Sequence, residues 1–174
     1  QGISYAPMQR QTLELALKNQ LLVITGGPGT GKTTSIRAIL AMFGEIGIKT
    51  LLCAPTGRAA KRMTELTGRD AATVHRMLGA KFDEDNDRVV FTKDESDRLD
   101  CDAVILDECS MVDICLMDAL LRALPPDARL IMVGDADQLP SVGPGNVFSA
   151  LIRSQVVATV RLTEIFRQTG DSRI

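Results

Sequence analysis

The apolar residues of this chain follow two alternating patterns. Short continuous apolar runs bounded by glycine, polar or charged residues predict buried strands, and longer segments with apolar side chains at helical spacing predict helices. The predicted strands are 21–25, 50–54, 103–107, 129–135 and 156–162. The predicted helices are 8–19, 33–47, 57–68, 72–79, 113–124 and 147–154. This alternation predicts an α/β fold, with a mostly parallel sheet covered by helices on both faces.

Residues 81–100 interrupt the alternation. The segment, KFDEDNDRVVFTKDESDRLD, is rich in acidic residues, and only RVVFT within it has the composition of a strand. We expect a surface insertion there, either a loop or an edge hairpin, rather than a second domain. A chain of 174 residues is most simply one domain, long enough to bury about 70% of the surface of its unfolded chain.

Composition narrows the class of protein. The chain is 45% hydrophobic and 24% charged, as ordinary globular proteins are, and no apolar run approaches the ~20 residues that a membrane span needs. Its four cysteines show no CxxC spacing, and it has one histidine. We therefore expect no zinc site and no disulfide framework, but reduced thiols in a cytosolic protein. The net charge of −2 gives no sign of nucleic-acid binding, so any such surface must be local.

The segment GGPGTGKT, residues 26–33, joins a predicted strand to a predicted helix and fits the pattern G-x-x-x-x-G-K-[ST]. Such a loop directs backbone N–H groups and a helix N-terminus toward phosphate oxygens. Lys32 is placed to reach the β- and γ-phosphates of ATP, and Thr33 to place its hydroxyl on Mg²⁺. The candidate nucleotide-binding residues of the loop are Gly27, Pro28, Gly29, Thr30, Gly31, Lys32, Thr33 and Thr34.

An acidic pair follows another buried strand, in the segment VILDECS. Asp107 ends the apolar run and is placed to hold the magnesium shell, which makes it a second candidate metal ligand beside Thr33. Glu108 is the candidate general base that takes a proton from the attacking water. An acid pair after a strand can also be a solvated loop, but behind a phosphate loop it favours a hydrolase over a passive nucleotide binder.

A third polar segment, VGDADQLPSVGPG (133–145), follows the strand predicted at 129–135. Ligands of open α/β sheets bind outside the carboxyl ends of the strands, which makes this segment a candidate part of the same site. We interpret Asp135 and Asp137 as residues that shape the turn by accepting hydrogen bonds from backbone N–H groups.

Six segments in order carry a resemblance to a known family: ITGGPGTGKT, CAPTGRAAKRM, TVHRMLG, VILDECSM, VGDADQLPSVGPG and LTEIFRQ. They resemble the motifs of superfamily 1 DNA helicases, and most closely those of the RecD/TraA branch, which moves 5′ to 3′ on single-stranded DNA. The match runs from about Gln9 to Gln168. It implies a P-loop NTPase with the fold of the first RecA-like motor domain, in which strand 129–135 lies between the phosphate-loop strand and the Asp-Glu strand.

The resemblance assigns roles to three further residues. Gln138 corresponds to a glutamine that bonds the γ-phosphate or the attacking water and reports the nucleotide state to the DNA track. Gln9 stands where related helicases place an amide that reads adenine, and Arg167 resembles an arginine that stabilises charge at the γ-phosphate in the transition state. The alternatives are a turn residue for Gln138 and solvent-exposed side chains for the other two.

A local basic surface lies between residues 57 and 76, which include five Lys or Arg against two acidic residues. Helix 57–68 is expected to carry Ala59, Met63 and Leu66 on one face and Arg58, Lys61 and Arg62 on another. The resemblance points to contacts with the DNA backbone from Thr56, Arg58, Thr73, His75 and Arg76. A solvated helix face is the alternative for the basic residues, and a packed, hydrogen-bonded side chain is the alternative for the histidine.

The family pattern also implies partners. Helicases of this type need a second RecA-like domain, whose motifs do not occur in this sequence, and the chain opens on Gln1 rather than methionine. We therefore expect residues 1–174 to be a single motor domain from a longer helicase, with single-stranded DNA and that second domain as partners and no membrane partner. An RNA helicase of the same superfamily and a nucleotide-gated binding module without useful turnover remain the alternatives.

Overall fold

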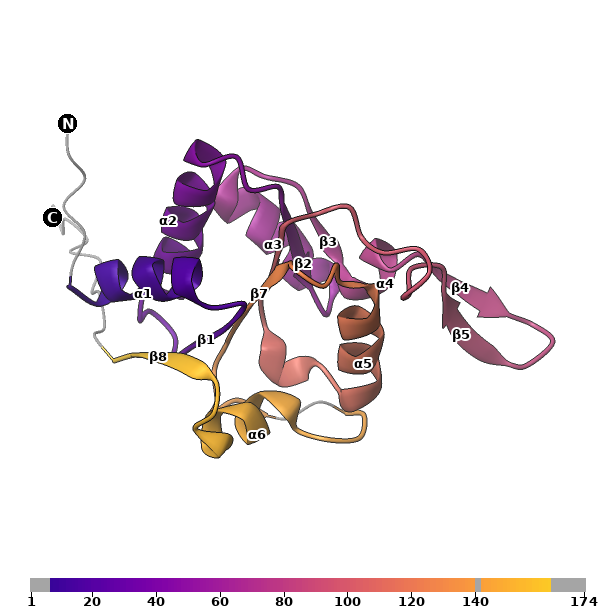
Figure 1. Ribbon diagram of the computed structural model, residues 1–174. Coiled ribbons are helices and arrows are strands. Elements are labelled where there is room, and N and C mark those ends of the chain that lie inside the picture. The colour runs from indigo at the N-terminus through magenta and orange to yellow at the C-terminus, as the bar shows by residue number, and fades with distance from the viewer. Residues whose placement is uncertain (1–6, 140–141, 164–174) are drawn as a thin grey trace, which may run out of the picture.

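The fold is built around one six-stranded sheet (Figure 1). The computed structural model describes residues 7–139 and 142–163. The strands are β1 (Leu21–Gly26), β2 (Thr50–Ala54), β3 (Ala71–Thr73), β6 (Ala103–Leu106), β7 (Arg129–Gly134) and β8 (Ala158–Leu162). Their order in the sheet is β3-β2-β6-β7-β1-β8, and every neighbouring pair is parallel. The predicted parallel α/β architecture is confirmed.

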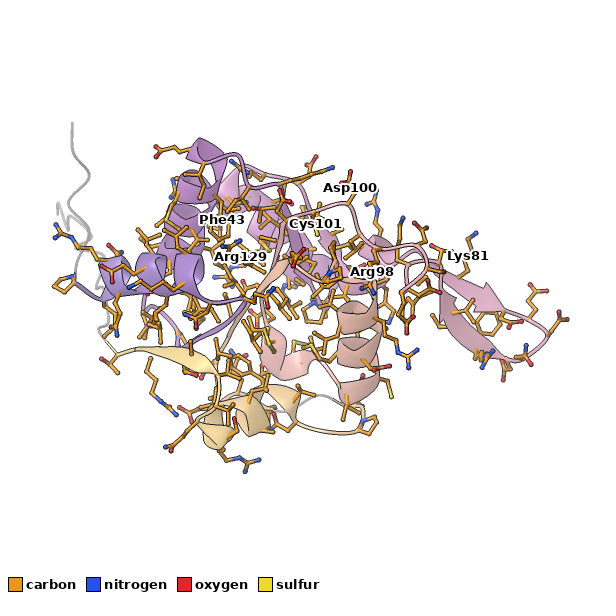
Figure 2. The ribbon with its side chains drawn as sticks, viewed as in Figure 1. Phe43, Lys81, Arg98, Asp100, Cys101 and Arg129 are labelled. Carbon is orange, nitrogen blue, oxygen red and sulfur yellow. The ribbon has the colours of Figure 1, made fainter. Side chains whose placement is uncertain are left out.

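Helices cover both faces of the sheet (Figure 1). They are α1 (Pro7–Lys18), α2 (Lys32–Glu45), α3 (Gly57–Thr67), α4 (Val74–Met77), α5 (Ile114–Ala123) and α6 (Val147–Ser154), with a short 3₁₀ helix, η1, at Cys109–Met111. Successive strand residues point to opposite faces, so Leu22 packs with α1, α2 and α3, whereas Val23 packs with α4, α5 and α6. Phe43 of α2 is fully buried between helix and sheet (Figure 2).

The two central strands are buried along most of their length. All four residues of β6 and five of the six residues of β7 are buried, as expected of parallel strands covered on both faces. β7 pairs with β1 on one side and with β6 on the other. The strand predicted between the phosphate-loop strand and the Asp-Glu strand therefore lies there, and this prediction is confirmed.

Residues 80–91 form a separate antiparallel hairpin of β4 (Ala80–Asp83) and β5 (Arg88–Phe91), which projects from the body of the molecule (Figure 1). Lys81 lies on this projection (Figure 2). The expected hairpin is therefore present, but within the described residues it forms a sheet of its own and does not extend the edge of the main sheet. The turn is closed by Asp83, whose carboxylate accepts hydrogen bonds from Asp85 N and Asn86 Nδ2 at 3.2 and 2.8 Å.

The predicted helix at 72–79 is only partly correct. Its first two residues belong to β3, and the helix that follows is the single turn α4. The edge of β2 explains the difference, because Ala71 and Thr73 pair in parallel with Leu52 and Ala54. The hydroxyl of Thr73 then accepts a hydrogen bond from Arg76 N at 3.1 Å and caps the short helix.

Candidate active site

The phosphate loop connects β1 to α2, as predicted. Gly29 and Gly31 have φ values of 74° and 91°, which glycine adopts without the steric cost that other residues incur. The hydroxyl of Thr30 donates to Gly27 O at 2.7 Å and closes the loop from within. The ammonium group of Lys32 donates to Gly26 O at 2.6 Å and to Gly27 O at 2.9 Å. The loop therefore holds its lysine over the space where phosphates are expected.

One cavity of about 530 Å³ opens beside this loop. It lies at the carboxyl ends of β1, β6 and β7, where parallel sheets place their ligands. The predicted site residues that line it are Pro28, Gly29, Gly31, Lys32, Thr33, Thr34, Asp107, Glu108 and Gln138. The other lining residues are Ile36 and, from α3, Ala59, Arg62, Met63, Leu66 and Thr67. Three segments far apart in sequence thus meet around one space.

The acidic pair follows β6 directly. The backbone N–H of Asp107 donates to Cys53 O at 3.0 Å, and one carboxylate oxygen of Asp107 accepts the N–H of Glu108 at 2.8 Å. Glu108 has a φ of 55° and a ψ of 40°, a left-handed conformation uncommon for a residue with a side chain. This turn of the backbone sends the chain into η1 and leaves both carboxylates lining the cavity.

Burial raises the pKa of Asp107 above its ordinary value. The hydrogen bond from Glu108 N and the positive charges of Lys32 and Arg62 lower the pKa, and the Glu108 carboxylate raises it further. Burial disfavours the charged form of this carboxylate. A bound divalent cation would stabilise that charged form.

The donor set fits magnesium better than a metal held by protein ligands alone. Within residues 7–139 and 142–163, no three His, Cys, Asp or Glu side chains are grouped closely enough to hold a metal ion. Thr33 and Asp107 both line the cavity beside the phosphate loop. Mg²⁺ is commonly held by one or two protein oxygens together with substrate phosphates and water, and this pair can supply such a share.

The helix η1, which follows the acidic pair, packs closely against the end of β7. A Cβ atom added at Gly134 would lie 3.1 Å from a ring carbon of Phe148 and 3.2 Å from the backbone N of Cys109. Glycine at the end of β7 therefore lets η1 pack directly on the strand. Cys109 itself is buried, its Sγ lies 3.0 Å from Leu106 O, and burial raises the pKa of its thiol well above the ordinary value. Such a thiol is packing material rather than a nucleophile.

Gln138 lies at the rim of the cavity, in the turn after β7. The hydroxyl of Ser110 donates to Gln138 Oε1 at 3.4 Å. The carboxylate of Asp135 accepts the N–H of Asp137 at 3.0 Å, and Asp135 O accepts the N–H of Gln138 at 3.2 Å. The interpretation of Asp135 as a residue that shapes the turn is confirmed, and the turn leaves the Gln138 side chain directed to the site.

The predicted DNA-contacting residues gather outside the cavity, at the starts of α3 and α4. Thr56 caps α3 by accepting the N–H of Ala59 at 3.2 Å, in the manner of Thr73 in α4. Arg58, His75 and Arg76 are exposed. The ring of His75 lies 5.8 Å from that of Phe91 in the projecting hairpin. The histidine is thus exposed beside an aromatic ring rather than packed in the core.

Among the described residues, Gln9, Gly27 and Thr30 do not line this cavity, and one residue that lines it was not predicted. Gln9 is half-buried in the first turn of α1, and Arg167 lies outside the described residues. Arg62 is exposed, as its sequence pattern indicated, but it also lines the cavity. The signal for it was its position three residues after Ala59 and next to Met63, which line the same cavity.

Comparison with known proteins identifies the family. The model of the AAA_19 family, described as an AAA domain, matches residues 9–144, which include the phosphate loop, the acidic pair and Gln138. The chain belongs to this AAA domain family. The AAA domain is 42% identical over 166 residues to the ATP-dependent RecD2 DNA helicase of Deinococcus radiodurans, covering 95% of this chain and 22% of that protein. It is 41% identical over 167 residues to the RecBCD enzyme subunit RecD of Mycobacterium tuberculosis, covering 83% of this chain and 28% of that subunit.

A solved structure supports the fold. The AAA domain is similar to the Pif1 helicase of Candida albicans with a TM-score of 0.66 and 25% identity, over 98% of this chain and 42% of that one. The predicted resemblance to RecD-type superfamily 1 helicases and the RecA-like fold are confirmed. The chain spans about a quarter of the length of the two RecD relatives. Among the described residues, no helix is long and apolar enough to cross a membrane.

Proposed function

We propose that this AAA domain binds ATP with Mg²⁺ and hydrolyses it as the motor domain of a DNA helicase that moves 5′ to 3′ on single-stranded DNA. One observation carries the proposal. A single cavity is lined by the phosphate loop, two carboxylates and an amide that come from the ends of three adjacent strands. Phosphoryl transfer depends mainly on positioning and electrostatic stabilisation, and these are the groups that provide both.

The residues of the cavity divide the work of hydrolysis. The N–H groups of the loop and Lys32 bind the β- and γ-phosphates, and Thr33 and Asp107 hold the metal. When bound, Mg²⁺ neutralises part of the phosphate charge. Glu108 accepts a proton from the water that attacks the γ-phosphorus, and the bond between that phosphorus and the bridging oxygen of ADP breaks. Gln138 holds the attacking water or a γ-phosphate oxygen.

Two further predicted residues are assigned to the nucleotide, Gln9 to the adenine and Arg167 to the γ-phosphate. Gln9 belongs to α1, which packs on β1 and β8, and this position supports its assignment as the residue that reads adenine. Arg167 follows β8 in the sequence, and β8 pairs in parallel with β1, the strand that the phosphate loop follows. We propose that its guanidinium group reaches the γ-phosphate as the transition state forms.

Single-stranded DNA is the proposed track. The relative from Deinococcus radiodurans, which is named as an ATP-dependent DNA helicase, supports DNA as the ligand. The exposed side chains of Arg58, His75 and Arg76, with the hydroxyls of Thr56 and Thr73, form the proposed contact surface at the starts of α3 and α4. Contacts of this kind go to phosphates, so binding should weaken as salt rises.

The proposed helicase contains more than this one domain. Because the chain spans about a quarter of its RecD relatives, we propose that residues 1–174 form one motor domain of a longer helicase. A second RecA-like domain completes the nucleotide cleft and the track, and the protein works in the cytosol in recombination, repair or DNA transfer.

The proposal is tested by measuring ATP turnover by the full-length protein under three conditions. These are single-stranded DNA, single-stranded RNA of the same length, and no nucleic acid. We expect DNA to raise the turnover number severalfold and RNA to have little effect. Stimulation by RNA alone would instead identify an RNA helicase. Tight ATP binding without turnover under any condition would leave only a nucleotide-gated binding module.

A further inference from the structure

Arg62 occupies a position in the nucleotide cavity that the proposed mechanism does not use. It lies in α3, one turn after Arg58, and lines the cavity together with Lys32, Asp107 and Glu108. Both Arg62 and its neighbour Lys61 are exposed, but Lys61 does not line the cavity. The helix therefore turns one of two adjacent cations toward the space beside the phosphate loop.

Packing of α3 fixes this orientation. Ala60 and Met63 are buried, with exposed fractions of 5% and 3%, and hold the helix against β2 and its neighbours. The helix begins at the Thr56 cap and ends at Gly68, whose φ of 70° terminates it. Side chains on a helix anchored at both ends cannot rotate about the helix axis, so Arg62 stays on the cavity side.

The order of the strands decides which end of a nucleotide Arg62 meets. The phosphate loop follows β1. On one side of it lies β8, against which α1 packs, and on the other side lie β7, β6 and β2. α3 follows β2, so it stands on the side of Asp107 and Glu108. With adenine toward α1, the terminal phosphate points toward that acidic pair and toward Arg62.

The guanidinium group is available for an anionic ligand. None of the ion pairs formed within the described parts of the chain involves Arg62. Its charge acts on Asp107 across the cavity and lowers the pKa of that carboxyl. A guanidinium group makes paired, charge-assisted hydrogen bonds to phosphate oxygens, which a lysine cannot match in geometry.

We propose that Arg62 donates hydrogen bonds to the γ-phosphate of bound ATP and thereby makes this site distinguish ATP from ADP. The inference rests on the proposed function, because it requires that a nucleoside triphosphate occupies the cavity. ADP lacks the group that Arg62 contacts, so the arginine strengthens binding of the triphosphate alone. During hydrolysis the same contact stabilises the charge on the transferred phosphoryl group.

The test compares two nucleotides in the full-length protein. Dissociation constants for ADP and for a non-hydrolysable ATP analogue, each with Mg²⁺, are measured by calorimetry for the wild type and for Arg62→Ala, Arg62→Lys and Lys61→Ala. We expect Arg62→Ala to weaken analogue binding about tenfold or more, the usual worth of a hydrogen bond to a charged group, and ADP binding less than twofold. Arg62→Lys should recover part of the loss. Lys61→Ala should match the wild type in both constants and in turnover without DNA.

Two outcomes would overturn the inference. An equal loss for ADP and for the analogue would mean that Arg62 acts only through Asp107 and the metal. Unchanged binding of both nucleotides would mean that Arg62 does not face the ligand. Lys32→Ala separates this failure from failure of the proposed function: if it weakens both nucleotides while Arg62→Ala weakens neither, the cavity assignment holds and only the role of Arg62 is wrong.

Discussion

Replacing Lys32 with alanine is the sharpest single perturbation of the phosphate site. In the free protein the Lys32 ammonium group bonds Gly26 O at 2.6 Å and Gly27 O at 2.9 Å. The Lys32 charge therefore already has hydrogen-bond partners before ATP binds. ATP binding exchanges two bonds to neutral carbonyl oxygens for bonds to phosphate oxygens that carry negative charge.

The size of the effect follows from this exchange. An ammonium group and a phosphate charge about 4 Å apart attract each other by about 4 kcal/mol at an effective dielectric constant of about 20. Giving up the carbonyl bonds returns about 1–2 kcal/mol of this gain. The net contribution of Lys32 is then about 2–3 kcal/mol, which corresponds to a loss of roughly 30- to 150-fold in affinity for Mg-ATP in Lys32→Ala.

Calorimetric titration of the full-length protein with ATP and Mg²⁺ measures this loss, and turnover should fall to background in the same variant. Lys18→Ala is the matched control. Lys18 is an exposed lysine of α1 whose side-chain contact is with Glu14 at 3.9 Å, and its removal should leave ATP affinity unchanged. A folded Lys32→Ala protein that binds ATP as tightly as the wild type would refute the assignment of the phosphate loop.

Three further predictions concern Asp107, Gln138 and DNA binding by the isolated chain. Asp107→Asn should raise the thermal stability of the nucleotide-free protein at neutral pH, because burial raises the pKa of Asp107 and makes its charged form unfavourable. The gain should shrink as the pH falls through the raised pKa and vanish below the unfolded value of ~3.9, and a gain that persists at low pH would contradict this cause. Gln138→Ala should leave ATP affinity within about threefold, under ~0.7 kcal/mol, but abolish most of the stimulation of ATP turnover by DNA; a variant that keeps full stimulation would make Gln138 a turn residue only. The isolated 174-residue chain should bind single-stranded DNA weakly, with affinity that falls as salt rises, and strand separation by it alone would contradict the need for a second domain.

Local sequence patterns were sufficient to predict the central strands and the phosphate loop. β6 and β7 are continuous apolar runs because both faces are covered, and the loop pattern specifies its own glycines. The end of β6 at Leu106, directly before Asp107, is also visible in sequence because the first charged residue ends the apolar run. These features depend on neighbours in the chain, so a single sequence contains them.

Features that depend on tertiary packing were missed. β3 has three residues and exists because the edge of β2 is available for pairing. The left-handed turn at Glu108 and the helix η1 depend on the close approach of Gly134. Neither the close packing that Gly134 allows nor the free edge of β2 produces a local pattern in the sequence.

The faces of α3 were assigned only partly correctly for the same reason. Ala59, Met63 and Leu66 were expected to form its apolar face, but Ala60 and Met63 are the buried residues, and Leu66 is 43% exposed. Ala59, Met63 and Leu66 do share the face that lines the cavity, but Arg62, which was expected on the basic face, lines it with them. Helical periodicity predicts that such a helix is amphipathic, but packing against the sheet decides which residue meets the ligand.

ATP hydrolysis in the presence of single-stranded DNA, compared between the full-length wild type and Glu108→Gln, decides whether the cavity is a hydrolytic site. Glu108 lines the cavity without being part of the phosphate loop, so the change removes the proposed general base and keeps the side chain's size. We expect ATP binding within a few-fold of the wild type and hydrolysis reduced by about 100-fold or more. Equal hydrolysis by the two proteins would contradict the proposed mechanism.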